Sequence, residues 1–176
     1  MRKSVFIATS LDGFISRENG DIDWLEEFNK TAPEGEDCGY KNFIKTVDVI
    51  VMGRKSFEKV LSFDQWPYTQ KVLVLTTRQI SIPNHLKSRI TTTSDSPSNL
   101  CKQLMAEGNQ HVYIDGGITI QSFLREGLID DLTITTIPIL LGKGLSLFGE
   151  LSTDVKPVHK KTISFPFGAV QSTYQI

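Results

Sequence analysis

The segments VMGRKSFE (residues 51–58) and VYIDGGITI (residues 112–120) decide the fold of this chain. Each passes from an apolar run through a small glycine turn into a stretch with helical spacing. Such a turn leaves backbone N–H groups free at the start of a helix, where phosphate groups bind. One turn of this kind is common, whereas two in one chain predict a site for a dinucleotide.

Outward from these segments, short β-branched runs alternate with helical stretches. Strands are expected at residues 5–9, 47–52, 71–76, 89–93, 111–115 and 132–137. Helices are expected at residues 55–61, 99–107 and 119–126, with Ser96 and Pro97 before the second and with Gly108 and Gly127 as stops. This alternation predicts an α/β fold with a mainly parallel sheet.

The C-terminal part has a different pattern. Residues 158–165 and 169–176 read as two strands, and only Pro166-Phe167-Gly168 separates them. A connection of three residues is too short for a parallel crossover, so these strands are predicted to form an antiparallel hairpin. A length of 176 residues with 39% hydrophobic residues fits a single domain covering residues 1–176.

Composition excludes several classes of function. Nineteen Lys and Arg against 20 Asp and Glu give no general field for binding nucleic acid or anionic lipid. The two cysteines and three histidines lack the spacing of a disulfide scaffold or a metal site, so no metal is expected. No run of about 18 apolar residues is present, and the chain is expected to be soluble and cytoplasmic.

The glycine turns also carry candidate ligands. In the first, Arg54 offers a forked cation and Ser56 a hydroxyl, although a turn glycine beside a solvated arginine is a simpler reading. In the second, Gly116 and Gly117 free N–H groups up to that of Ile118 for a pyrophosphate, with Thr119 adding a hydroxyl; the alternative is a bend required by the helix. Both turns follow strands, and open α/β sheets bind ligands at that edge.

Three further segments are candidates for the same cleft. Thr77 and Arg78 follow an apolar run and would suit an adenosine 2′-phosphate, unless they are merely a polar loop start. The long irregular stretches 11–20 and 29–37 are expected to border the cleft. Asp21 is predicted to cap a short helix in which Trp24 faces either the pocket or the core.

Four segments together resemble the dihydrofolate reductase superfamily, and in particular the RibD C-terminal domain, the reductase domain of bacterial riboflavin biosynthesis proteins, with its stand-alone relatives. They are ATSLDGFI (residues 8–15), VMGRKSFE (51–58), IDGG (114–117) and the stretch from Asp130 to Phe148. The resemblance implies a dihydrofolate-reductase-like three-layer α/β/α fold with a mainly parallel mixed sheet that ends in an antiparallel C-terminal hairpin.

The resemblance also implies an NADPH-dependent reductase and assigns its residues. The cofactor would be held by Ala8, Thr9, Gly13, Gly53, Arg54, Lys55, Ser56, Thr77, Arg78, Gly116, Gly117, Ile118 and Thr119. Within this set Ala8 and Thr9 would contact the nicotinamide, and residues 11–15 would form a loop that closes over it through Gly13. Phe14 and Trp24 would contact the substrate.

The acid and the substrate follow from the same resemblance. Asp37 is the expected catalytic acid, because it lies where folate-reducing relatives place their pterin-binding acid, but it could equally cap the helix that follows. The expected substrate is a small heterocycle, first of all 5-amino-6-(5-phosphoribosylamino)uracil, with dihydrofolate as an alternative. A nucleotide-binding module without turnover and an assembly subunit with purely structural glycine turns are the competing classes of function. Relatives commonly dimerise, so a homodimer is expected.

Overall fold

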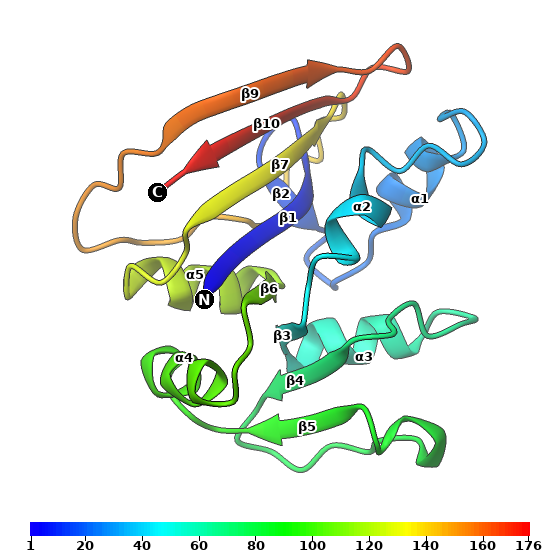
Figure 1. The fold of residues 1–176 in the computed structure, drawn as a ribbon. Helices are drawn as coiled ribbons and strands as arrows, with labels where there is room; N and C mark the ends of the chain where they lie inside the picture. The colour runs from blue at the N-terminus through cyan, green and yellow to red at the C-terminus, as the bar shows by residue number, and fades with distance from the viewer.

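A computed structural model describes residues 1–176 and shows helices on both faces of one eight-stranded sheet (Figure 1). The strand order is β5-β4-β3-β6-β1-β7-β10-β9. Its members are β1 (Arg2–Ser10), β3 (Val49–Gly53), β4 (Lys71–Leu75), β5 (Ile90–Thr93), β6 (His111–Asp115), β7 (Asp131–Ile137), β9 (Val158–Ser164) and β10 (Val170–Gln175). Neighbours from β5 to β7 are parallel, and β10 is antiparallel to β7 and β9. The predicted mainly parallel sheet with its C-terminal hairpin is confirmed.

The helices divide between the two faces of the sheet, which gives the three layers. They are α1 (Asp23–Asn29), α2 (Tyr40–Ile44), α3 (Arg54–Leu61), α4 (Pro97–Ala106) and α5 (Gly117–Arg125), with a short 3-10 turn η1 (Asn84–Leu86). The helices α4 and α5 pack on one face, while α2 and α3 pack on the other. None of these helices has the length and apolar character needed to cross a membrane.

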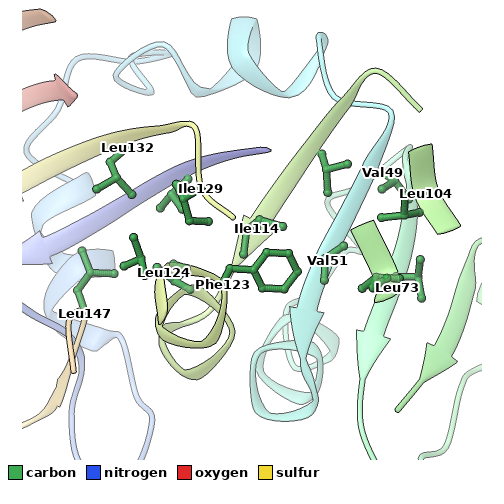
Figure 2. Packing of buried hydrophobic residues seen from close by; sticks show 14 residues of the cluster. Val49, Val51, Leu73, Leu104, Ile114, Phe123, Leu124, Ile129, Leu132 and Leu147 are labelled. Carbon is green, nitrogen blue, oxygen red and sulfur yellow. The ribbon is translucent and has the colours of Figure 1, made fainter. Parts of the chain in front are cut away.

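Burial on both faces explains the uninterrupted apolar runs of the central strands. In β3, Val49 and Val51 pack toward α4 and α5, whereas Ile50 and Met52 pack toward α3. Figure 2 shows Phe123 of α5 against the sheet, in the hydrophobic cluster that also contains Val49 and Val51. Its side chain is 1% exposed. Truncating such a side chain to alanine costs about 3–5 kcal/mol, so this contact contributes strongly to holding α5 against the sheet.

Two expectations about local structure change. The stretch 11–20 is not wholly irregular, because β2 (Phe14–Ser16) pairs with β8 (Leu145–Ser146) outside the main sheet. Asp21 does not cap α1, and that prediction is wrong: Ile22 occupies the cap position, and the Asp21 carboxylate contacts Asn19 and Lys59 instead. The Ser96 cap of α4 is confirmed, since its hydroxyl accepts the N–H of Asn99.

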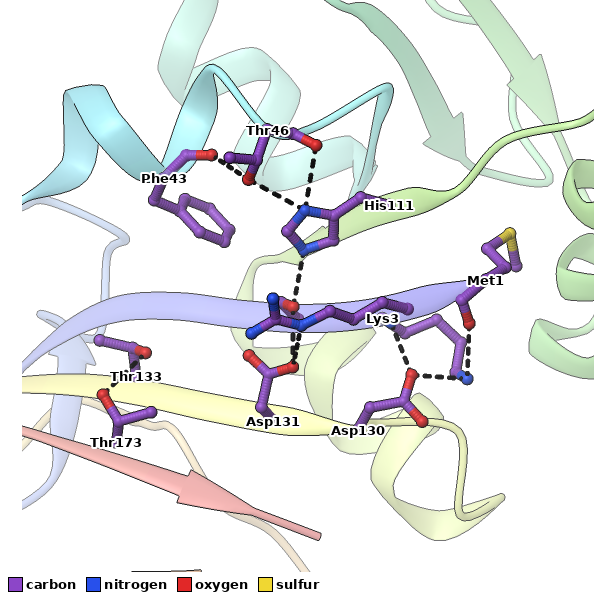
Figure 3. A network of polar contacts seen from close by, with 11 residues as sticks. Met1, Lys3, Phe43, Thr46, His111, Asp130, Asp131, Thr133 and Thr173 are labelled. Atoms are coloured by element: carbon purple, nitrogen blue, oxygen red, sulfur yellow. Dashed lines mark hydrogen bonds and ion pairs between the residues drawn. The ribbon is translucent and has the colours of Figure 1, made fainter. Parts of the chain in front are cut away.

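The amino ends of β1, β6 and β7 meet in a paired polar network (Figure 3). His111 Nε2 lies 2.7 Å from Ser4 Oγ, which lies 3.0 Å from the Asp131 carboxylate. His111 Nδ1 lies 3.1 Å from the carbonyl oxygen of Thr46. Arg2 Nε donates to the same Asp131 carboxylate at 2.7 Å. The polar groups at this edge are therefore bonded to one another.

Candidate functional site

The opposite, carboxyl edge of the sheet is open. A cleft of about 1380 Å³ runs along it, lined chiefly by residues 53–56, 75–78 and 115–119, and also by residues 15, 16, 18–22 and 144–146. We call it the main cleft. Pockets for drug-sized ligands measure about 300–1,000 Å³, so this one has room for a longer molecule such as a dinucleotide.

The two glycine turns lie against each other and both line the main cleft. A Cβ added to Gly53 would lie 3.1 Å from the hydroxyl oxygen of Thr119. A Cβ added to Gly116 would overlap Ser56 Oγ, and the φ angle of Gly116 is 85°, which side chains rarely tolerate. Glycine is therefore required where the second turn meets the first, and the turns do converge on one site.

Both helices that begin at these turns start without a capping side chain. The cap residue of α3 is Gly53 and that of α5 is Gly116, and neither can offer an oxygen to the N–H groups of the first turn. These N–H groups stay free for a ligand, and the helix dipoles add positive potential at the same points. Two such helix starts suit the phosphates of one dinucleotide.

A third segment adds a cation to this end of the cleft. The hydroxyl of Thr76 accepts the backbone N–H of Arg78 at 3.0 Å, which folds the end of β4 into a tight turn. Arg78 is exposed and has no ion-pair partner, whereas Arg54 pairs with Glu58 at 2.7 Å. Arg78 is therefore the cation best placed to meet a terminal phosphate.

The floor of the main cleft holds an acid that the sequence analysis did not select. Asp115 ends β6, directly before the second glycine turn, and accepts a hydrogen bond from the Tyr113 hydroxyl at 3.1 Å. Burial raises the pKa of the Asp115 carboxyl, although the Tyr113 hydroxyl and the Gly116 N–H act in the opposite direction. Tyr40 and Tyr68 line the cleft beside it. The position of Asp115 directly before Gly116 in the segment IDGG was the feature of the sequence that could have identified it.

Asp37 lies elsewhere. Its two carboxylate oxygens accept the backbone N–H groups of Gly39 and Lys41, each at 2.9 Å. Asp37 thereby holds the first turn of α2, although Gly39 and not Asp37 occupies the cap position. Asp37 does not line the main cleft, but it does line a smaller neighbouring pocket.

Most of the residues expected to hold the cofactor line the main cleft, and five expected site residues, Asp37 among them, do not. Those that line it are Ala8, Gly53, Arg54, Lys55, Ser56, Thr77, Arg78, Gly116, Gly117, Ile118 and Thr119. Thr9 is buried, and Gly13 and Phe14 lie in the turn and strand that pack toward Gly144 and Leu147. Trp24 is 3% exposed and packs with Ile137 in the core, the alternative that the sequence left open.

The segment expected to close over the nicotinamide is fastened to its neighbours. Asp12 accepts the N–H groups of Leu141 and Gly142, and the Leu147 N–H donates to the carbonyl of Gly13. A closing movement of residues 11–15 would have to break these bonds. Residues 18–22, which line the main cleft just beyond them, carry fewer such ties.

The smaller pocket opens beside the main cleft and measures about 370 Å³. We call it the side pocket. It is formed by β1, β7, α1, the connection to α2 and the turn of the C-terminal hairpin. The side pocket and the main cleft share five lining residues and are therefore continuous over β1. These residues are Phe6, Ile7, Ala8, Leu25 and Tyr40.

Comparisons with other proteins agree on one family. The profile of the RibD C-terminal domain matches residues 4–166 of this chain. The uncharacterized protein YwjB of Bacillus subtilis (strain 168) is 38% identical over 169 residues, which span 93% of this chain and 92% of YwjB.

Two solved structures resemble the fold closely. One is a protein of Shewanella sp. PV-4 whose name assigns it provisionally to riboflavin biosynthesis; it is 40% identical, with a TM-score of 0.92 over 99% of this chain and 98% of the other. The second is a diaminohydroxyphosphoribosylaminopyrimidine deaminase/5-amino-6-(5-phosphoribosylamino)uracil reductase from Thermotoga maritima, with 13% identity and a TM-score of 0.72. That match covers 99% of this chain and 56% of the other, and it concerns the fold alone.

Proposed function

This chain belongs to the RibD C-terminal domain family, and from that premise we propose that it is an NADPH-dependent reductase of a small heterocyclic substrate. The observation that carries the proposal is the convergence of two uncapped helix starts, at Gly53 and at Gly116, on one cleft. A fold shared with reductases would not be enough, because one fold serves many functions.

The chain offers a place for each charged part of the cofactor. The free N–H groups at the start of α5 would hold the pyrophosphate, and those at the start of α3 would meet the adenosine side. Arg78 would pair with the 2′-phosphate, since a forked guanidinium bonds phosphate well. Little space is left at the start of α5, because a Cβ on Gly117 would lie 2.7 Å from the side chain of Ile15.

The nicotinamide would lie against Ala8, which lines both the main cleft and the side pocket. When bound, NADPH supplies the hydride that reduces the substrate. The chain aligns the reacting atoms and supplies the proton that balances the added hydride. Asp115 would supply this proton, because it lines the main cleft together with Tyr40, which also lines the side pocket, and because burial raises the pKa of its carboxyl.

Binding of the cofactor tests the proposal first. We expect NADPH to bind the whole chain more tightly than NADH in calorimetry, because only NADPH carries the phosphate that Arg78 would meet. Binding of neither nucleotide would end the proposal. Binding without oxidation of NADPH by any ring compound would instead favour a nucleotide-binding module.

Turnover is the second test. The reference substrates are 5-amino-6-(5-phosphoribosylamino)uracil and dihydrofolate, and loss of absorbance of NADPH reports the reaction. The residues that line the side pocket restrict the choice of substrate further.

A further inference from the structure

In the proposed reductase, the hydride acceptor would lie in the side pocket. This pocket joins the main cleft through residues on β1, including Ala8, against which the nicotinamide would lie. Its volume of about 370 Å³ suits one small ring system with a short substituent. The chemistry of its walls therefore selects the substrate.

The walls carry no positive charge. Ten of the 14 lining residues are hydrophobic, and the other four are Asn29, Glu36, Asp37 and Thr135. The nearest lysines in sequence, Lys30 and Lys41, do not line the pocket, and Lys30 pairs with Glu27. No lysine, arginine or histidine lines the pocket.

The two carboxylates are fixed at the pocket rather than free to swing away. Glu36 accepts the N–H of Cys38 at 2.7 Å, and Asp37 holds the first turn of α2 through the N–H groups of Gly39 and Lys41. A phosphate in this pocket would face two anions and no cation. Because a buried anion requires a compensating partner, such a substrate would bind poorly.

The cations of the main cleft do not relieve this problem. Arg54, Lys55, Lys59 and Arg78 line the main cleft but not the side pocket. Two of them already have partners, because Lys59 pairs with Asp21 at 3.3 Å and Arg54 with Glu58. The other two cations, Lys55 and Arg78, would be needed for the phosphates of the cofactor.

One polar group does point to the kind of ring that fits. Thr135 is 5% exposed, and its hydroxyl oxygen accepts the side-chain N–H of Gln171 at 2.9 Å. Its own O–H proton has no acceptor in the protein and can be donated to a carbonyl or ring nitrogen of a ligand. The pocket thus offers an apolar slot in which the Thr135 hydroxyl is a donor, with two carboxylates at its rim.

Building on the proposed reductase function, we propose that the side pocket takes a flat heterocycle that bears no phosphate and is uncharged or positively charged. This excludes the phosphoribosyl form of the riboflavin intermediate and retains its dephosphorylated form. It equally favours unphosphorylated pterins.

A matched pair of substrates tests the proposal. NADPH oxidation is measured with 5-amino-6-(ribosylamino)uracil and its 5′-phosphate, and then with 7,8-dihydroneopterin and its phosphate ester. We expect kcat/KM for the phosphate-free member to exceed that of its ester by about tenfold or more in at least one pair. Equal or higher kcat/KM for the esters would overturn the proposal.

Calorimetry on the protein loaded with NADP⁺ separates the possible failures. If NADP⁺ and NADPH bind but none of the four ring compounds does at millimolar concentration, the substrate assignment is overturned while the cofactor site survives. If neither nucleotide binds, the proposed function itself fails before any ring compound is added, and the substrate assignment falls with it.

Two variants test whether the carboxylate rim causes the discrimination. Glu36→Gln keeps an oxygen for the Cys38 N–H but removes the charge, and we expect kcat/KM for the esters to rise by about two- to fivefold. Glu34→Gln is the matched control, because Glu34 lies in the same connection but outside the pocket. An identical ratio in both variants and the parent chain would show that the rim does not select the substrate.

Discussion

The strand β6 has a titratable residue at each end, and the two ends differ in what surrounds them. At the amino edge of the sheet His111 contacts Ser4 and Thr46, and the network continues to Asp131. At the carboxyl edge Asp115 has only the Tyr113 hydroxyl as a side-chain partner, and it faces an open cleft. Burial favours the neutral form at both ends, since it lowers the pKa of His111 and raises that of Asp115.

The difference teaches how one sheet separates stability from function. Groups at the amino edge are bonded to each other, so losing one leaves its partner unsatisfied in the folded protein. Groups at the carboxyl edge have fewer partners in the protein, so losing one is expected to change binding or turnover more than stability. Variants at the two edges should therefore change different measured quantities.

The largest effect is expected for Asp115→Asn. An amide has the same shape but cannot donate a proton to the reduced substrate, so kcat should fall by about a hundredfold to ten-thousandfold. In the parent chain, kcat should decline as the pH rises above the raised pKa of Asp115, and this decline should disappear in the variant.

The control for this variant is Asp95→Asn, since Asp95 lines the main cleft but bonds to Thr93. This variant should keep kcat within a few fold of the parent value, because surface substitutions of this kind usually perturb the folded protein little. If Asp115→Asn keeps full activity with an unchanged pH profile, the proton comes from another group.

A smaller effect is expected for Arg78→Ala. Loss of one charge-assisted phosphate contact should weaken NADPH binding by roughly tenfold to a hundredfold while leaving NADH binding unchanged. Arg125→Ala, an exposed arginine on α5 that does not line the cleft, should alter neither nucleotide. Equal weakening of both nucleotides would mean that Arg78 does not read the 2′-phosphate.

The sequence could predict that the two glycine turns lie at one end of the main cleft, because the residues of each turn are close together along the chain. Gly53 with Ser56, and Gly116 with Thr119, each lie within a few residues along the chain, and a strand-turn-helix pattern places them at the same sheet edge. The pattern also placed the six main strands, because runs buried on both faces must be apolar.

The side pocket could not be predicted in the same way. Its walls come from five parts of the chain, and Phe6, Phe28 and Phe167 meet there only because β1, α1 and the hairpin turn pack together. Nothing in the spacing of these residues records that contact. The same reason explains why Trp24 could not be assigned to core or pocket.

At the amino edge, Ser4→Ala should reduce stability without changing the affinity for NADPH. Ser4 is fully buried, and removing its hydroxyl leaves His111 Nε2 and an oxygen of Asp131 without this partner. The expected loss is about 1–3 kcal/mol in the free energy of unfolding, measured by urea denaturation. Ser62→Ala, an exposed hydroxyl bonded only to its own helix, should change stability by less than about 0.5 kcal/mol. Weaker NADPH binding in Ser4→Ala would break the separation between the two edges.

The smallest effect is a dependence of stability on pH that arises from His111. Its folded-state pKa lies below its ordinary value because burial and the nearby Arg2 both disfavour the imidazolium, despite opposing effects of the Thr46 carbonyl, Asp131 and Asp48. The unfolded chain then binds the proton first as the pH falls, so stability is complete above about pH 6.5 and decreases below it. The lowered pKa of Asp48 acts only at more acidic pH, below the ordinary range of a carboxyl, so the two contributions separate. Urea midpoints measured between pH 8 and pH 5 should show this decrease in the parent chain, and His111→Gln should remove it. A decrease of the same size in His111→Gln would assign the pH dependence to other groups and leave the amino edge without a titrating member in this range.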